Sequence, residues 1–189
     1  MRILAAVLAH AGVWAVMAQA ALGDADAAYR YFTYLSPAHR SRRTERAEAY
    51  RIEPYVMAGD IYSAPPYVGR GGWSWYTGSA AWMHRAAIES MFGVSQRGDE
   101  LVVRPCLPSA WSQAELRLTR AGKSVRLLFA RAGDAAPEAL AAAASARLLG
   151  IGEAVRWSSL DGTVPLLVVM ADTGGAARPA AAAELADAG

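Results

Sequence analysis

The stretch GRGGWSWYTGSA, residues 69–80, joins a glycine-rich loop to the start of a helix. Its first three glycines and Arg70 form a loop whose backbone can approach a ligand closely. Thr77-Gly78-Ser79 then opens a helical run over residues 80–92, and the free N–H groups of a helix start favour phosphate or another anion. The aromatic side chains between loop and helix suit a sugar ring beside that anion. The stretch indicates either such a site or a packed loop with buried tryptophans, and the residues alone leave both open.

Beyond this helix the spacing of apolar residues changes from the helical period to the period of a strand. Residues 115–119 and 124–129 alternate apolar and polar side chains, and a turn at residues 121–123 joins them. This pattern predicts an antiparallel hairpin with one solvated face. Residues 155–157 and 164–170 are predicted as the last strands, so the chain as a whole is predicted to be α+β.

Several helices are predicted before residue 69. Gly23 ends one helix and Asp24 caps the next, which runs from residue 26 to residue 35. Residues 42–50 form a polar helical run, and Glu53-Pro54 is predicted to start another short helix because proline favours the first helical position. Residues 62–72 hold two prolines and three glycines and are predicted to be a loop.

The composition limits the classes of function. The 189 residues are 54% hydrophobic and carry a net charge of +2, which suits one ordinary domain or two small ones and argues against nucleic-acid binding. The single cysteine, Cys106, excludes an internal disulfide and a thiolate zinc cluster. The three histidines, His10, His39 and His84, share no ligand spacing, so no metal site is predicted.

The first residues allow three interpretations. Residues 3–18 are almost entirely apolar, and Ala18-Gln19-Ala20 follows as a small-residue cleavage site, so residues 1–20 read as a signal peptide of a secreted protein. A membrane span is the second interpretation, although His10 and Gln19 interrupt it. The third is a helix that is apolar all round because its neighbours bury it.

Three segments carry a resemblance to a known family: Glu53-Pro54-Tyr55-Val56, Gly59-Asp60-Ile61-Tyr62-Ser63, and residues 69–79. They resemble the C-terminal end of the catalytic region of glycoside hydrolase family 94, which holds inverting disaccharide phosphorylases and cyclic β-1,2-glucan synthetases. The resemblance implies that residues 1–93 are the last helices of an (α/α)6 barrel. It further implies a β-sandwich-like domain over residues 94–172, and the composition of residues 173–189 predicts a disordered tail.

The resemblance also implies roles for individual residues. His10, four residues before Trp14, matches a family segment whose histidine contacts phosphate. The phosphate-binding residues implied are His10, Thr77, Gly78 and Ser79. The sugar-binding residues implied are Arg70, Trp73 and Trp75. The partners are then a β-linked glucan or disaccharide and inorganic phosphate as co-substrate, with no cofactor. The resemblance favours the buried-helix interpretation of the first residues and a cytoplasmic location, or the cytoplasmic side of the inner membrane as part of a larger protein.

Two groups that the family's chemistry needs are missing from this sequence. An inverting phosphorylase requires a general acid to protonate the leaving oxygen, and the family's aspartate lies on an earlier helix. The family's Lys-Glu-Asn-Gly-Gly run before the histidine is replaced here by Arg2-Ile3-Leu4-Ala5-Ala6. We therefore expect a fragment that supplies the phosphate side of an active site, is inactive alone, and pairs with the missing N-terminal part of the enzyme. The alternative is a secreted glycan-binding or structural α+β module without catalysis.

Overall fold

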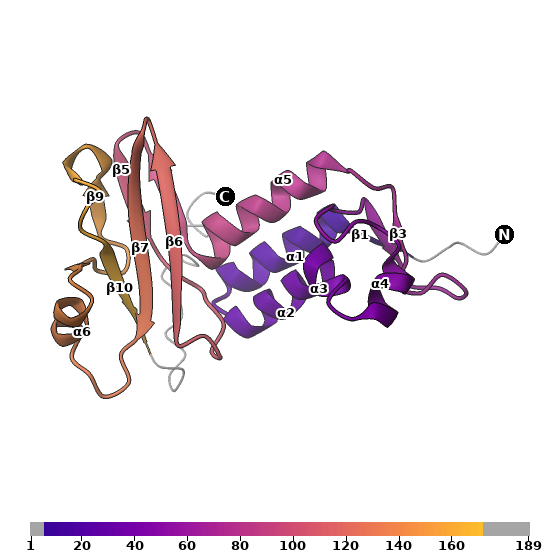
Figure 1. The fold of residues 1–189 in the computed structure, drawn as a ribbon, viewed down its shortest axis with the longest axis horizontal. Helices are drawn as coiled ribbons and strands as arrows, with labels where there is room; N and C mark the ends of the chain where they lie inside the picture. Colours follow the sequence, from indigo (N-terminus) through magenta and orange to yellow (C-terminus); the bar gives the residue numbers. More distant parts are fainter. Residues whose placement is uncertain (1–5, 172–189) are drawn as a thin grey trace, which may run out of the picture. The chain divides into compact units, whose positions relative to one another are not determined.

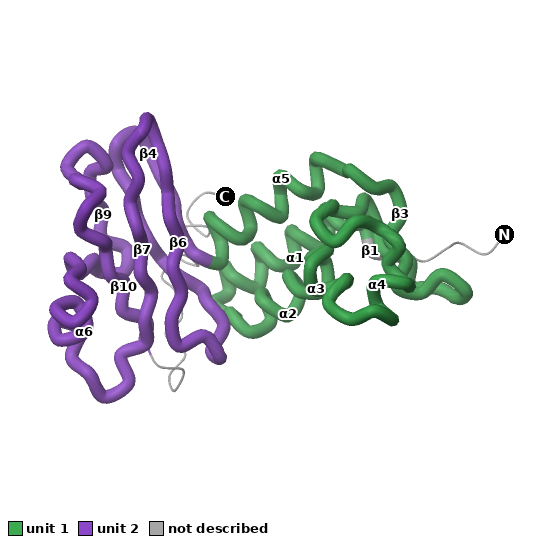
Figure 2. Tube along the Cα trace, in the orientation of Figure 1, with its two compact units in different colours: residues 1–91, 179–189 green, residues 92–178 purple. Residues whose placement is uncertain are grey.

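The computed structural model describes residues 6–171, which form two compact units, residues 6–91 and 92–171 (Figures 1 and 2). The fold mixes helices and sheets, so the α+β prediction is confirmed. The predicted tail at residues 173–189 lies outside the described residues, and so do residues 2–5 of the run that replaces the family's Lys-Glu-Asn-Gly-Gly.

The first unit is mainly helical. Its elements are β1 (Ala6–Leu8), α1 (Ala9–Ala21), α2 (Ala25–Leu35), α3 (Pro37–Arg40), α4 (Thr44–Tyr50), β2 (Asp60–Tyr62), β3 (Gly71–Gly72), α5 (Thr77–Arg85) and the π-helix η1 (Ala86–Met91). The helix predicted for residues 80–92 is confirmed, although it begins three residues earlier at Thr77. Figure 1 shows α1 between α2 and α5.

Helix α1 is packed into this unit as a structural helix. Val13 and Val16 are fully buried, and Gly12 lies so close to α2 that a Cβ there would come within 2.9 Å of the Leu35 side chain. The predicted cap of α2 is confirmed, because the Asp24 carboxylate accepts a hydrogen bond of 2.9 Å from the Ala27 N–H. None of the helices within residues 6–171 has the length and apolar character needed to cross a membrane.

The first unit also contains a small three-stranded sheet in the order β1-β2-β3, and the sequence patterns did not predict it. β2 pairs antiparallel with both neighbours, so Asp60 lies opposite Leu8 on one side and Gly72 on the other. The helix predicted at Glu53-Pro54 is wrong, because residues 54 and 55 form a turn. The chain then continues in an extended conformation. The Gly59 N–H donates to the carbonyls of Gly72 and Trp73, and the Met57 carbonyl accepts from the Tyr76 N–H, so these groups do not form helical hydrogen bonds.

The second unit contains two sheets. Its elements are β4 (Val94–Arg97), β5 (Glu100–Val103), β6 (Gln113–Arg120), β7 (Lys123–Arg131), α6 (Pro137–Ala143), β8 (Arg147–Leu148), β9 (Ala154–Arg156), the 3-10 helix η2 (Trp157–Ser159) and β10 (Leu166–Met170). One sheet has the order β6-β7-β10-β8 and the other β4-β5-β9. The predicted hairpin is confirmed as β6 and β7, whereas β10 runs parallel to β7, a pairing that alternation along one strand does not reveal.

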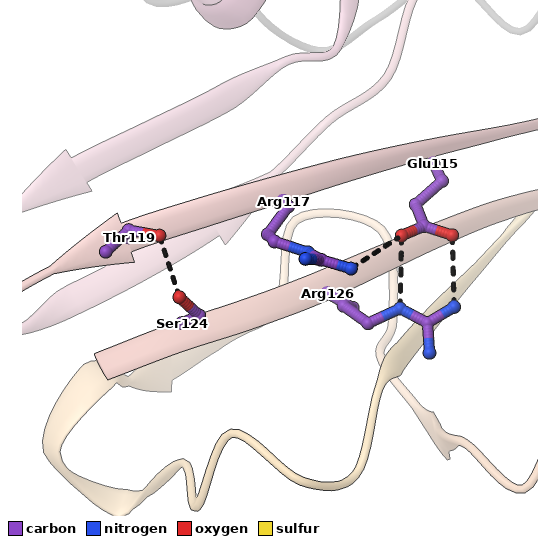
Figure 3. Close-up of polar contacts among 5 residues, drawn as sticks. All are labelled: Glu115, Arg117, Thr119, Ser124 and Arg126. Carbon is purple, nitrogen blue, oxygen red and sulfur yellow. Dashed lines mark hydrogen bonds and ion pairs between the residues drawn. The ribbon is translucent and has the colours of Figure 1, made fainter. Parts of the chain in front are cut away.

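The two faces of the hairpin differ as the alternation predicts. Val125, Leu127 and Phe129 of β7 are buried. On the opposite face, Figure 3 shows Glu115 accepting two hydrogen bonds from the guanidinium of Arg126, at 3.1 and 3.0 Å. The hydroxyls of Thr119 and Ser124 lie 2.8 Å apart further along the same face. This face is therefore a solvated polar surface.

Side chains also fix the turns of the second unit. The ammonium of Lys123 donates to the carbonyls of Trp157 and Ser158, each at 3.3 Å, and to that of Leu160. The Asp99 carboxylate accepts from the Ser158 N–H at 3.0 Å and from the Ser158 hydroxyl at 2.5 Å. These bonds hold η2 against the β4–β5 and β6–β7 turns.

Candidate functional site

The candidate site lies where α1 and α5 begin, because one extended segment holds both helix starts. The Ala9 N–H donates to the Gly59 carbonyl at 2.9 Å, and the Tyr76 N–H donates to the Met57 carbonyl at 3.3 Å. The two helices run in the same direction. His10 lies beside Gly78, and one turn further along Trp14 contacts Trp82 with ring centroids 5.9 Å apart.

The imidazole of His10 packs directly against Gly78. A Cβ at Gly78 would lie 2.9 Å from Cε1 and 3.0 Å from Nε2 of His10, so only a glycine leaves the ring this room. The ring also meets Tyr76 edge to face, with centroids 5.2 Å apart. His10 is half-buried and Thr77 is exposed. The structure thus brings His10 and Gly78 into contact, with Thr77 next to them in the chain.

Both helix starts lack a side-chain cap, although the Gly59 carbonyl accepts from the first N–H of α1, that of Ala9. Neither α1 nor α5 carries an acidic residue in its first turn. Their first-turn N–H groups therefore have no acceptor from a cap and present the positive ends of two helix dipoles side by side. This arrangement can hold an anion.

The Ser79 side chain points into the interior of the unit, although the resemblance implies that it binds phosphate. It is fully buried, and its hydroxyl lies 3.0 Å from the Ala58 carbonyl and 2.9 Å from the Tyr76 carbonyl. The single hydroxyl proton is used by these carbonyls, so the side chain has no donor to offer a ligand. The hydroxyl ties α5 to the segment before β2.

The two tryptophans of the loop project outward, which overturns the alternative of a loop with buried tryptophans. Trp73 is 75% exposed and Trp75 is 64% exposed. Both have left-handed backbones, with φ of 53° and 60°. Such conformations cost about 1–3 kcal/mol each in non-glycine residues and cluster at functional sites. Backbone bonds hold them, since the Gly59 N–H donates to the carbonyls of Gly72 and Trp73, both at 3.0 Å.

The tryptophans face different neighbours. Trp73 packs on Tyr76 with ring centroids 4.9 Å apart and lines a cavity of about 360 Å³ together with Arg70. Trp75 instead contacts Tyr55 at 6.3 Å between centroids and donates to the Glu53 carboxylate at 3.4 Å. Of the predicted sugar-binding residues, Arg70 and Trp73 therefore line the same cavity, whereas Trp75 lies outside it.

The sequence patterns missed Tyr76, Tyr62 and Tyr67 as site residues. Tyr76 links His10 to Trp73, and the other two line the cavity beside Arg70. The sequence contained one signal for Tyr62. Residues 60–62 alternate along a strand, so Asp60 and Tyr62 share one face and the buried Ile61 lies on the other. Within residues 6–171, no three histidine, cysteine or acidic side chains come together as metal ligands.

Comparison with known proteins identifies the class to which this arrangement belongs. Residues 1–93 match the family model of the glycosyl hydrolase 94 superfamily catalytic domain, and this part of the chain belongs to that family. The chain is 49% identical over 111 residues to the cyclic beta-(1,2)-glucan synthase NdvB of Rhizobium meliloti (strain 1021). It is 33% identical over 113 residues to the N,N'-diacetylchitobiose phosphorylase of Vibrio furnissii and 26% identical over 120 residues to the solabiose phosphorylase of Paenibacillus borealis.

These relatives are much longer than the matched region. The matches cover 58%, 59% and 62% of this chain, but only 4%, 14% and 15% of the three relatives, in the same order. The chain thus spans a small part of the length of each relative.

Proposed function

We propose that residues 1–93 form the phosphate-binding side of the active site of an inverting β-glycoside phosphorylase or cyclic β-1,2-glucan synthase. One observation carries this proposal: His10 packs against Gly78 where two uncapped helix starts meet. The family membership of residues 1–93 supports it. In the proposed enzyme these helices are the last ones of an (α/α)6 barrel.

In this proposal the anion is held by several short hydrogen bonds. The Gly78 N–H and the Thr77 hydroxyl donate from the start of α5, and His10 donates from α1. An imidazolium adds a charge-assisted bond to phosphate, which is about twice as strong as a neutral one. Phosphate, not water, is then the group positioned for attack on the sugar.

The reaction exchanges one bond at the anomeric carbon for another. A phosphate oxygen forms a bond to the anomeric carbon as the bond from that carbon to the glycosidic oxygen breaks, and a general acid protonates the leaving oxygen. The configuration inverts because attack and departure occur on opposite faces. We propose that the acid comes from another part of a longer enzyme, so this chain binds phosphate without catalysing the exchange alone.

The proposed sugar substrate is a β-linked glucan or disaccharide. The names of the relatives, which include a beta-(1,2)-glucan synthase and a diacetylchitobiose phosphorylase, support this class. The exposed indoles of Trp73 and Trp75 and the guanidinium of Arg70 are suited to the faces and hydroxyls of sugar rings. We further propose a cytoplasmic location, supported by the packing of α1 as a structural helix of the first unit.

A second candidate is a glycan-binding module without catalysis. The strained, exposed tryptophans favour it, because they present aromatic surface whether or not a general acid is nearby. The two candidates differ in one respect: only the phosphorylase proposal requires phosphate to bind at His10.

The test of the proposal is phosphate binding to the full chain, measured by isothermal titration calorimetry. We expect His10→Ala to weaken phosphate binding about 10-fold or more, because a hydrogen bond to a charged group contributes roughly 1.5–3 kcal/mol. Gly78→Ala keeps its backbone N–H, but we expect it to weaken binding in the same direction, because its Cβ would lie 2.9 Å from Cε1 of His10 and displace the imidazole. His84→Ala is the matched control, because His84 is an exposed histidine in the last turn of α5. Equal losses in the three variants, or no saturable binding by the parent chain, would contradict the proposal.

A further inference from the structure

One sheet of the second unit ends in a long strand whose outer edge is unpaired. The order of this sheet is β6-β7-β10-β8, so β6 is an edge strand of eight residues. Within residues 6–171, β7 is the only strand that pairs with it. We propose that this edge pairs antiparallel with β6 of a second copy of the chain and forms a symmetric dimer. The inference concerns the second unit and does not rest on the proposed function.

The backbone groups of β6 alternate between β7 and the open edge. The Arg131 N–H donates to the Ser112 carbonyl at 3.0 Å, and these two residues continue the register of the β6–β7 ladder. Because bonded pairs alternate along an antiparallel ladder, the even-numbered residues of β6 then bond to β7, and the odd-numbered residues direct their N–H and carbonyl groups outward. Such an unpaired row is a template for another strand.

The two edges of this sheet differ in length. β6 has the sequence QAELRLTR, without the proline or lysine that commonly protect an edge strand from pairing. The opposite edge, β8, has only two residues. Extension of the sheet is therefore expected at β6 alone, and a strand that pairs with its own copy closes the assembly as a twofold dimer.

The apolar face of the sheet is only partly covered at β6. The buried residues of β7 lie opposite Ala114, Leu116 and Leu118, which are half-buried. A shallow cavity of about 510 Å³, with Phe92 and Trp111 in its lining, lies beside Ala114. A further strand at this edge would cover these side chains and remove apolar surface from water.

One arginine of β6 lacks a close acidic partner. Arg117 lies directly opposite Arg126 of β7, and like charges in such a position repel. Its guanidinium is 3.9 Å from the Glu115 carboxylate, which already accepts two hydrogen bonds from Arg126 (Figure 3). A second carboxylate near Arg117 would therefore stabilise the strand, and a carboxylate can accept more than two hydrogen bonds.

The charges select one register for the pairing of β6 with its copy. When Leu116 lies opposite the partner's Leu116, Glu115 lies opposite the partner's Arg117, and the twofold axis repeats this pair. Both residues of the pair are odd-numbered, so their outward backbone groups also meet. A register that pairs Glu115 or Arg117 with its own copy places like charges opposite each other.

The same register matches the sizes of the apolar side chains. Ala114 lies opposite the partner's Leu118, so a small residue beside the shallow cavity faces a large one. The two copies of Leu116 meet at the axis. Opposite charges on one face and complementary sizes on the other thus favour the same alignment of the two strands.

Sedimentation equilibrium of the full chain at increasing concentration tests the dimer. We expect a reversible monomer–dimer equilibrium, and Arg117→Glu should weaken it about 10-fold or more, because both symmetric pairs change from attraction to repulsion. The substitution places a glutamate opposite Arg126, so the monomer should remain folded. Arg97→Glu is the matched control, because Arg97 is an exposed arginine on β4, an edge strand of the other sheet.

A cysteine at the proposed axis tests the register. Leu116→Cys should form a disulfide-linked dimer on oxidation, because residues in a non-hydrogen-bonded pair have Cα atoms about 4.5 Å apart, within the range of disulfides. Leu118→Cys is the control, because the two copies of residue 118 would lie four residues, or roughly 13 Å, apart along the strands. Native Cys106 is present in both variants, so any disulfide that it forms is common to them.

The outcomes either support or overturn the dimer. A concentration-dependent dimer that Arg117→Glu weakens and Leu116→Cys captures supports it. A chain that is monomeric at every concentration, equal losses in Arg117→Glu and Arg97→Glu, or equal crosslinking in the two cysteine variants overturns it. None of these measurements involves phosphate, so this inference and the proposed function can fail separately.

Discussion

Gly93 lies at the start of the second unit, where no side chain fits. Its φ is +68°, and a Cβ there would overlap the carbonyl oxygen of Arg104, whose own N–H donates to the Gly93 carbonyl at 2.8 Å. The obstacle is backbone, which cannot rotate away as a side chain can. This residue therefore combines a conformational and a steric requirement for glycine.

We predict that Gly93→Ala destabilises the second unit by several kcal/mol. The left-handed backbone alone costs an L-residue roughly 1–2 kcal/mol, and the overlap with Arg104 adds to it. Gly98→Ala is the control, because Gly98 also has a positive φ, +58°, but a Cβ there meets nothing within 4 Å. Urea unfolding of the full chain measures both. Similar losses in the two variants would show that the close approach of Arg104 contributes nothing.

At the scale of the elements, the correct predictions concern features that depend on residues close together in the sequence. The cap at Asp24 and the alternation of the β6–β7 hairpin are set by neighbours in the sequence, and both were predicted correctly. The sheet formed by β1, β2 and β3 was missed, because its strands are only two or three residues long and β1 pairs with β2 across more than 50 positions. The helix predicted at Glu53-Pro54 failed because tertiary backbone bonds from residues 57 and 59 outweigh the local preference of proline.

In the candidate site too, the sequence indicated features set by neighbouring residues but not those set by distant ones. The residue types of the stretch from Arg70 to Ser79 predicted an anion-binding helix start and aromatic surface. They could not predict that Ser79 is turned inward, because the carbonyl of Ala58 that holds it is 21 positions away. Nor could they show that Trp75 turns toward Tyr55 and Glu53, because Glu53 lies 22 positions earlier in the chain.

The bond between Asp99 and Ser158 leads to a pH-dependent prediction. The hydrogen bond from the Ser158 hydroxyl is the main cause that lowers the pKa of Asp99 from its ordinary value of 3.8. A lowered folded-state pKa gives stability that is present above the unfolded pKa and is lost as the pH falls through the folded pKa. Ser158→Ala should therefore lower the urea midpoint near neutral pH, and the difference from the parent should shrink in acid below the ordinary pKa.

The control for this prediction is Ser159→Ala. Its hydroxyl donates to the Arg156 carbonyl at 2.7 Å, a group that does not titrate. Any loss of stability in this variant should be the same at neutral and acidic pH. A Ser158→Ala difference that does not change with pH would contradict the assigned role of Asp99.

At the scale of the whole molecule, the chain covers only a small part of the length of its relatives. This leads to a prediction about activity. The purified chain should release no glucose 1-phosphate from β-1,2-linked gluco-oligosaccharides or cellobiose, because in the proposed function the general acid comes from another part of a longer enzyme. General acid catalysis alone contributes roughly 100- to 10,000-fold. A coupled assay against a heat-denatured control measures this, and release above the control would contradict the proposal that the acid comes from another part of the enzyme.

The parallel packing of α1 and α5 has a consequence for the stability of the first unit. Two helix dipoles whose positive ends lie side by side repel one another, and the absence of acidic residues from both first turns leaves that repulsion uncompensated. The fold therefore carries an electrostatic cost at this end for as long as no anion is present. If phosphate binds here as proposed, it removes this repulsion and acts as a cap of both helices, so the phosphate-bound first unit should be more stable than the unit without phosphate.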